Sequence, residues 1–158
     1  MIRLAISNDV ISIINLVNSW DSGLSFPLDY NQKQYDLLMV NSREVGWVFE
    51  KNGIIVAFAG VTLRKNGEGR IPWLVWDKSL IDLKSVIKEL IKTILDYLIK
   101  NKVNIVTIKL PEIINQFKNL LPMSVYESKN SYPAEISKSG WPYDYLSIDV
   151  EKLRKLWL

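Results

Sequence analysis

The chain lacks two residue types on which many catalytic mechanisms depend. Its 158 residues include no cysteine and no histidine. Thiolate nucleophiles, disulfides, the commonest metal ligand and every mechanism that pairs serine or cysteine with histidine are therefore excluded. We predict no metal site. Catalysis would have to use carboxylates, tyrosine, lysine, serine, backbone amides or a bound cofactor.

Three carboxylates on or beside the predicted central strands are candidates for a general base: Glu50, Glu68 and Asp77. A carboxylate in a desolvated groove has its pKa raised toward neutrality, where it accepts a proton more readily. Most such residues are simply exposed charges, and the sequence does not choose among the three.

Lys84, Lys88 and Lys92 follow one another at intervals of four residues, which places them on one face of a predicted helix. Like charges at this spacing repel by about 0.2–0.5 kcal/mol per pair, so an anionic partner would relieve the repulsion. The simpler interpretation, which we favour, is a solvated face partly balanced by Glu89 and Asp96. Lys84 and Lys88 nevertheless lie in the half of the helix suited to a phosphate.

The N-terminal part of the chain predicts a strand followed by two helices. Residues 2–6 alternate between apolar and polar, as a strand does. Residues 7–9 supply helix-capping side chains, and apolar residues at helical spacing then continue to about Trp20. A second helix is predicted over residues 32–40.

A hairpin and a third strand follow. Asn52-Gly53 is a strong two-residue turn signal, which joins predicted strands over residues 44–51 and 54–63. A third strand is predicted over residues 70–76. Its proline, Pro72, indicates a sheet edge or a β-bulge, because proline has no N–H to donate to a neighbouring strand.

The C-terminal half begins with the longest predicted helix. Apolar residues recur at helical spacing from Val86 to Leu98, and Asn101 ends the helix. Residues 103–110 predict a buried strand, and Pro111 begins a short helix. The remaining predicted elements are strands over 125–129 and 143–150 and an amphipathic tail over 151–158.

Composition indicates one ordinary globular domain over residues 1–158, with residues 149–158 as a C-terminal tail. Apolar residues make up 48% and charged residues 23%, with a net charge of +3. No window is apolar enough for a membrane span, and the N-terminus does not resemble a secretory leader. We therefore expect a cytoplasmic protein.

The order of the predicted elements resembles the GNAT family of N-acetyltransferases over nearly the whole chain. The best-matching stretches are residues 2–18, the hairpin around Asn52-Gly53 with residues 55–60, and residues 74–77 with the helix after them. The resemblance implies an α/β fold, with a mixed, mainly antiparallel central sheet and helices on both faces.

The resemblance also implies acetyl-CoA as a ligand. In that family the fourth and fifth strands splay apart, and the pantetheine arm lies between them on strand backbone. The helix that follows holds the pyrophosphate on its first N–H groups, which favour anions. The positions that match these contacts are Val75, Trp76, Leu83, Lys84, Ser85 and Lys88.

The sequence departs from the family pattern in this loop. Asp82 stands where the family has an arginine, and Leu83, Ser85 and Ile87 stand at its glycines. We expect the Asp82 carboxylate to lie within the first turn of the helix, as a cap or in a capping box that begins at Ser79. There it would compete with a pyrophosphate for the same amides.

The family's tyrosine acid also lacks a counterpart at its usual place. Residues 115–123 form a shorter segment, with Pro122-Met123 where the family has Gly-Phe. Tyr126, on the next predicted strand, is the nearest candidate for the acid. Together with Tyr126, we name the carboxylate of Asp77 as a candidate catalytic residue.

Two functions remain open at this point. The first is an acyl-CoA-dependent N-acyltransferase, in which the amine of a small molecule or peptide attacks the thioester directly and strand amides stabilise the oxyanion. The second is a GNAT-like scaffold that does not bind CoA and acts as a binding or assembly module. A nucleic-acid binder fits less well with the modest net charge. The amphipathic tail would pack on its own domain or form a homodimer contact.

Overall fold

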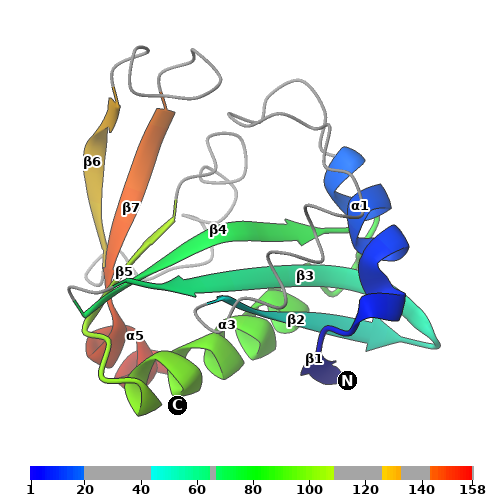
Figure 1. Cartoon of the computed structure of the whole chain (residues 1–158), viewed down its shortest axis with the longest axis horizontal. Coiled ribbons are helices and arrows are strands. Elements are labelled where there is room, and N and C mark those ends of the chain that lie inside the picture. Colours follow the sequence, from blue (N-terminus) through cyan, green and yellow to red (C-terminus); the bar gives the residue numbers. More distant parts are fainter. Residues whose placement is uncertain (20–43, 65–66, 109–125, 133–142, 158) are drawn as a thin grey trace.

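A computed structural model describes residues 1–19, 44–64, 67–108, 126–132 and 143–157 (Figure 1). Two predicted helices, over 32–40 and from Pro111, lie outside these residues. The described elements are, in chain order, β1 (Ile2–Leu4), the 3₁₀ helix η1 (Ser7–Asp9), α1 (Val10–Asn18), β2 (Glu44–Lys51), β3 (Ile54–Leu63), β4 (Glu68–Trp76), α3 (Leu83–Lys100), β5 (Ile105–Ile108), β6 (Tyr126–Tyr132), β7 (Tyr143–Asp149) and α5 (Val150–Trp157).

The strands form one sheet in the order β1-β2-β3-β4-β5-β7-β6. All neighbouring strands are antiparallel except β4 and β5, which are parallel and joined through α3. A parallel pair needs a long crossover of this kind, whereas the antiparallel pairs need only turns. The predicted mixed, mainly antiparallel sheet is therefore confirmed.

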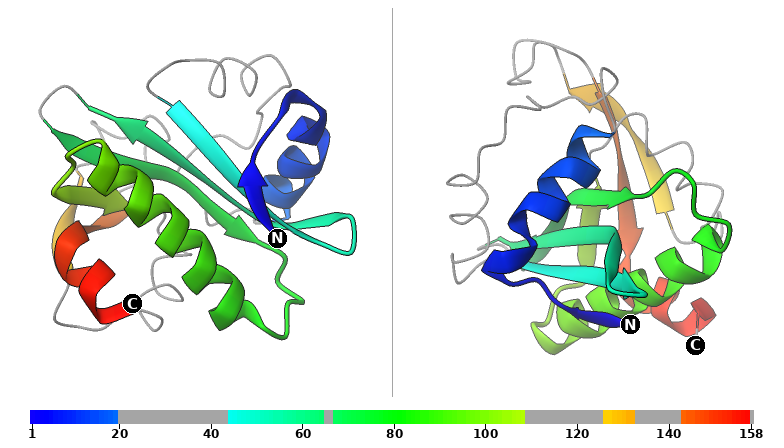
Figure 2. Two further views of the ribbon diagram at one scale, coloured as in Figure 1. Left: turned by 90° about the horizontal axis from the view of Figure 1, so that it is seen from below. Right: turned by 90° about the vertical axis from the view of Figure 1, so that its right-hand side faces the viewer.

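Helices cover both faces of the sheet. Figure 2 shows α1 on one face and α3 on the other. α1 packs against β3 and β4, and α3 packs against β2 and β3. Because β3 is covered on both sides, every residue from Val56 to Val61 is buried. The core beneath α3 includes Ile87, Leu90 and Ile94, each with no exposed surface.

The predicted hairpin is confirmed to the residue. Asn52 and Gly53 have φ angles of 53° and 77°, and a two-residue turn of the hairpin-favouring type needs a positive φ at both positions. β4 begins two residues earlier than predicted. Thr62 pairs with Arg70 while Gly60 pairs with Trp73, so β4 carries one extra residue there. Pro72 thus lies in a β-bulge, as expected.

α3 and the C-terminal tail also follow the sequence pattern. The backbone N–H of Asn101 bonds to carbonyls of the last turn of α3 and ends the helix. Lys84, Lys88 and Lys92 are exposed, as a solvated face predicts. α5 packs against α3 and buries Val150 and Leu153, so this tail packs on its own chain. No helix within the described residues is long and apolar enough to cross a membrane.

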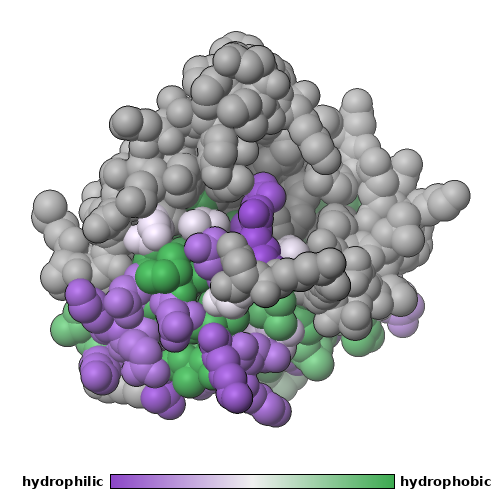
Figure 3. All heavy atoms as spheres, turned by 60° about the vertical axis from the view of Figure 1, so that its left-hand side comes forward, coloured by the Kyte–Doolittle hydropathy of each residue, from purple (hydrophilic) through white to green (hydrophobic). Residues whose placement is uncertain are grey.

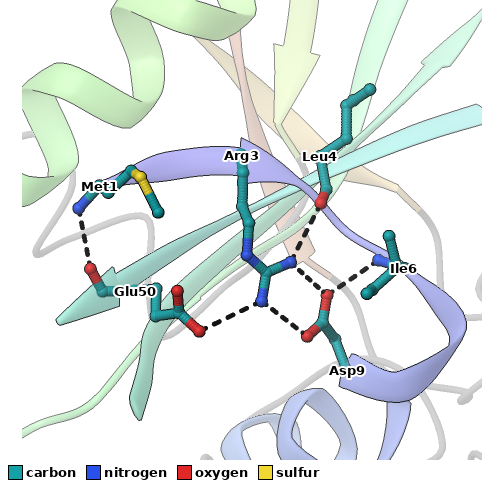
Figure 4. A network of polar contacts seen from close by, with 6 residues as sticks. All are labelled: Met1, Arg3, Leu4, Ile6, Asp9 and Glu50. Atoms are coloured by element: carbon teal, nitrogen blue, oxygen red, sulfur yellow. Dashed lines mark hydrogen bonds and ion pairs between the residues drawn. The ribbon is translucent and has the colours of Figure 1, made fainter. Parts of the chain in front are cut away.

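An ion-pair network links the first strand to the rest of the fold (Figure 4). The guanidinium of Arg3 donates to both carboxylate oxygens of Asp9, at 2.7 and 2.9 Å, and to Glu50 at 3.3 Å. The backbone N–H of Ile6 also donates to Asp9, at 2.8 Å. These contacts connect β1, the η1 turn directly before α1, and the end of β2.

Candidate functional site

The first component of the site is the second half of β4, beyond the bulge. In the described part of the chain, β4 pairs with β5 only from Glu68 to Ile71. From Trp73 to Trp76 it pairs with β3. The side chains of Val75 and Trp76 are buried in the core, so a ligand beside this part of β4 would meet its backbone rather than these two side chains.

The second component is the N-terminus of α3. Its first helical hydrogen bond runs from the N–H of Val86 to the carbonyl of Asp82, at 3.1 Å. Among the described residues, the N–H groups of Leu83, Lys84 and Ser85 have no hydrogen-bond acceptor. Three free N–H groups at the positive end of a helix dipole form a site for an anion.

The predicted position of Asp82 at the helix cap is confirmed, but its predicted capping hydrogen bond is wrong. It is the N-cap residue of α3, but its side chain makes no capping hydrogen bond. Its carboxylate instead accepts a hydrogen bond from Lys51 Nζ, at 3.0 Å, and this partner is 31 residues away in the sequence. Lys51 also lowers the pKa of Asp82. The carboxylate therefore does not compete for the first amides of the helix.

The capping box that was expected to begin at Ser79 is also absent from this described loop. The N–H and the hydroxyl of Ser79 donate to one oxygen of Asp77, at 2.9 and 2.7 Å. The N–H of Leu80 donates to the Asp77 carbonyl, at 3.1 Å. Asp77 thus organises the turn that leads from β4 toward α3.

The environment of Asp77 bears on its candidate role as a base. The hydrogen bonds from Ser79 stabilise the charged carboxylate and lower the pKa of Asp77. A general base that works near neutral pH needs a pKa shift in the opposite direction. Asp77 stays a predicted catalytic residue, whose pKa is lowered by its bonds to Ser79.

Two of the three candidate carboxylates come together in a pocket of about 570 Å³. The pocket lies between α1, the β2–β3 hairpin and the end of β4, and both Glu50 and Asp77 line it. Glu50 is paired with Arg3. Glu68 lies at the opposite end of β4, nearly the full length of that strand away. The other lining residues are Asp9, Ser12, Asn15, Leu16, Ser19, Gly53, Ile54, Ile55 and Lys78.

Lys84 and Lys88 place positive charge beside the free amides. Both side chains are exposed, as is Ser85 between them. Figure 3 shows hydrophilic side chains interspersed with smaller apolar areas over the lower part of the described surface.

The candidate acid Tyr126 lies on β6. Its backbone pairs with Ile148, and its side chain lies outside the described part of the structure.

Sequence reasoning missed Lys51. The hairpin prediction already placed Lys51 as the last residue of β2, next to the Asn52-Gly53 turn. Because side chains alternate along a strand, Glu50 and Lys51 point to opposite faces of the sheet. Glu50 contacts Arg3 and Lys51 contacts Asp82. This alternation of side chains along β2 is the signal from which a partner of Lys51 near α3 could have been predicted.

Comparisons with known proteins agree with this architecture. No protein-family model and no curated protein matches the sequence. Solved structures do match over nearly their full length. A GNAT-family acetyltransferase from Staphylococcus aureus has a TM-score of 0.74 and 12% identity, with 95% of this chain and 98% of that chain covered.

Two further structures illustrate the range of the match. A ribosomal-protein-alanine N-acetyltransferase from Brucella melitensis has a TM-score of 0.74 and 13% identity, with 94% of this chain and 99% of that chain covered. A putative acetyltransferase from Salmonella typhimurium, solved with its cofactor acetyl-CoA, has a TM-score of 0.70 and 13% identity, with 95% and 93% covered. From its strand order, the helices on both faces of its sheet and these matches, the chain has the GNAT acetyltransferase fold.

Proposed function

We propose that the chain is an acyl-CoA-dependent N-acyltransferase. The observation that carries the proposal is the set of N–H groups at Leu83, Lys84 and Ser85 that have no acceptor within the described residues. They follow a strand whose second half, beyond a bulge, pairs with β3 and has no described pairing with β5, in a chain with the GNAT fold. An anion site at the end of such a strand suits the pyrophosphate of a CoA thioester.

The residues present fit such a ligand. The free amides would bind phosphate oxygens, and the exposed ammonium groups of Lys84 and Lys88 would add positive charge. Lys51 neutralises the nearby carboxylate of Asp82. Ser85 is small at a position where close approach matters. When bound, acetyl-CoA would supply the activated acyl group as a thioester.

The protein would then contribute mainly by positioning the acyl donor and the amine acceptor. Backbone groups of Val75 and Trp76 would orient the donor along β4, so that the acyl carbon faces the acceptor. The acceptor would be an amine of a small molecule or a peptide, attacking directly. Tyr126 stays the candidate acid for the leaving thiolate.

Isothermal titration with CoA and acetyl-CoA tests the proposal. We expect heat of binding that weakens as salt is raised, because charged groups contact phosphate. Lys84→Ala and Lys88→Ala should each weaken binding. Lys92→Ala is the matched control, because it removes an exposed lysine from the same face one turn further from the amides. The absence of heat and of thermal stabilisation at millimolar CoA would contradict the proposal.

One observation favours a second candidate, a GNAT-like scaffold without CoA binding. The stretch from Asp77 to Lys88 contains no glycine, so each of its residues presents a Cβ atom where the family brings backbone close to phosphate. A scaffold of this kind would act as a binding or assembly module. It predicts a folded protein that gives no signal with CoA in the same titration.

A further inference from the structure

We infer that Lys51 is a positioning residue that holds the Asp82 carboxylate away from the first turn of α3 and thereby keeps the anion site available. The inference rests on the proposed function, since it concerns the same amides. Lys51 lies at the tip of the β2–β3 hairpin. The inference therefore gives this hairpin a part in an anion site that is formed by the end of β4 and the start of α3.

The position of Asp82 makes a free helix end unexpected. Aspartate at an N-cap normally accepts a hydrogen bond from the second or third N–H of the helix, which here belong to Lys84 and Ser85. A capping residue of this kind has an extended backbone, whereas Asp82 has φ −95° and ψ 33°. Its carboxylate bonds to Lys51, and neither amide has an acceptor in the part of the chain that the structure describes.

The β2–β3 hairpin places Lys51 where its ammonium group can bond to the Asp82 carboxylate. Lys51 pairs with Ile54 at the end of β2, directly before the turn at Asn52 and Gly53. Its neighbour Glu50 is bonded to Arg3, which anchors the end of the strand from the opposite face. The ammonium group is therefore presented to Asp82 from a defined position on the sheet.

The ion pair between Lys51 and Asp82 is exposed to solvent. The side chains of Lys51 and Asp82 are 47% and 45% exposed. Exposed pairs of this kind add little to folding stability because water and salt screen them. Without Lys51, Asp82 could take up the extended backbone of an N-cap and turn its carboxylate toward the helix N-terminus, which attracts carboxylates. A carboxylate there both occupies the amides and repels an incoming phosphate.

The test is a double-mutant cycle measured by titration with CoA. Lys51→Met should weaken CoA binding by about tenfold, the effect of one capping interaction competing for the site. Asp82→Ala should bind CoA at least as tightly as the original chain. The double variant should return to the affinity of Asp82→Ala. Should the double variant stay as weak as Lys51→Met, Lys51 would be a direct phosphate ligand and the inference would be overturned.

A second measurement needs no ligand. In Lys51→Met, the amide resonances of Lys84 and Ser85 should shift downfield and follow the acid titration of Asp82, because the carboxylate now caps the helix. In the original chain they should not. Absence of the titration in Lys51→Met overturns the inference even if CoA binds. Its presence, in a protein that does not bind CoA, sustains the inference about Lys51 and refutes the proposed function alone.

Discussion

The guanidinium of Arg3 holds the carboxylate of Asp9 through two hydrogen bonds, at 2.7 and 2.9 Å. Asp9 is the one polar or charged residue among the described residues that is buried, with 6% of its surface exposed. A buried carboxylate needs partners to offset the loss of hydration. Here those partners are Arg3 and the N–H of Ile6. The pair therefore fixes where α1 begins relative to the sheet.

Arg3→Met should lower the free energy of unfolding by about 2 kcal/mol, because hydrogen bonds to a charged group are lost and Asp9 stays buried. Urea denaturation followed by circular dichroism measures the effect. Arg64→Met is the control, since Arg64 is an exposed arginine at the end of β3. An equal loss in both variants would show that the ion pair has no special role.

The same pair gives stability a defined pH dependence. Hydrogen bonds from Arg3 lower the pKa of Asp9 below its ordinary value of 3.8. The stabilisation is therefore fully present above that value and is lost as the pH falls through the lower pKa of the folded state. Denaturation midpoints measured below about pH 4 should decline less in Asp9→Asn than in the original chain. Parallel declines in the two proteins would contradict this assignment.

Gly69→Ala should destabilise the fold by about 1–3 kcal/mol through overpacking. A Cβ at Gly69 would lie 2.9 Å from Leu98 Cδ2 and 3.2 Å from Val103 Cγ1. Thermal unfolding should show the loss. In a Leu98→Ala background the same substitution should cost less, because the nearer atom is gone. Strictly additive effects would show that contact with Leu98 is not the cause.

Leu153→Ala should cost about 3 kcal/mol, the usual range for a buried leucine. Leu153 is 1% exposed on α5, which packs against α3. Leu156→Ala is the matched control, since Leu156 on the same helix is 55% exposed. Chemical denaturation compares the two, and similar losses would argue against the observed face of α5.

The elements with strong local signals could be predicted from the sequence. The Asn52-Gly53 turn set the register of β2 and β3, and the apolar spacing from Val86 to Leu98 set α3. Val103 illustrates the limit of such signals. It was assigned to a strand for its apolar character, but it is buried just before β5 begins at Ile105. Burial alone does not distinguish a strand from a packed connection.

The candidate site was harder to predict because its details depend on distant contacts. Asp82 has the sequence context of a helix cap, and capping preferences are local. An ion pair to Lys51, on the neighbouring hairpin, overrides that preference. The contact between Ser79 and Asp77 is different, because aspartate in a turn commonly bonds to the backbone two residues further on, and this local preference was overlooked. For Asp82, propensity identified the residue and the tertiary arrangement determined its partner.

The parallel pairing of β4 with β5 has a consequence for the order of folding. Each pair in that ladder, from Glu68 with Ile105 to Ile71 with Ile108, joins residues 37 positions apart. The hairpin of β2 and β3 closes over two residues, so it can form rapidly and early. We expect the β4–β5 ladder to form only after α3 has formed and docked, because its partners are far apart in the chain. The end of β4 and the start of α3, where we propose that the acyl donor binds, would then be completed late in folding.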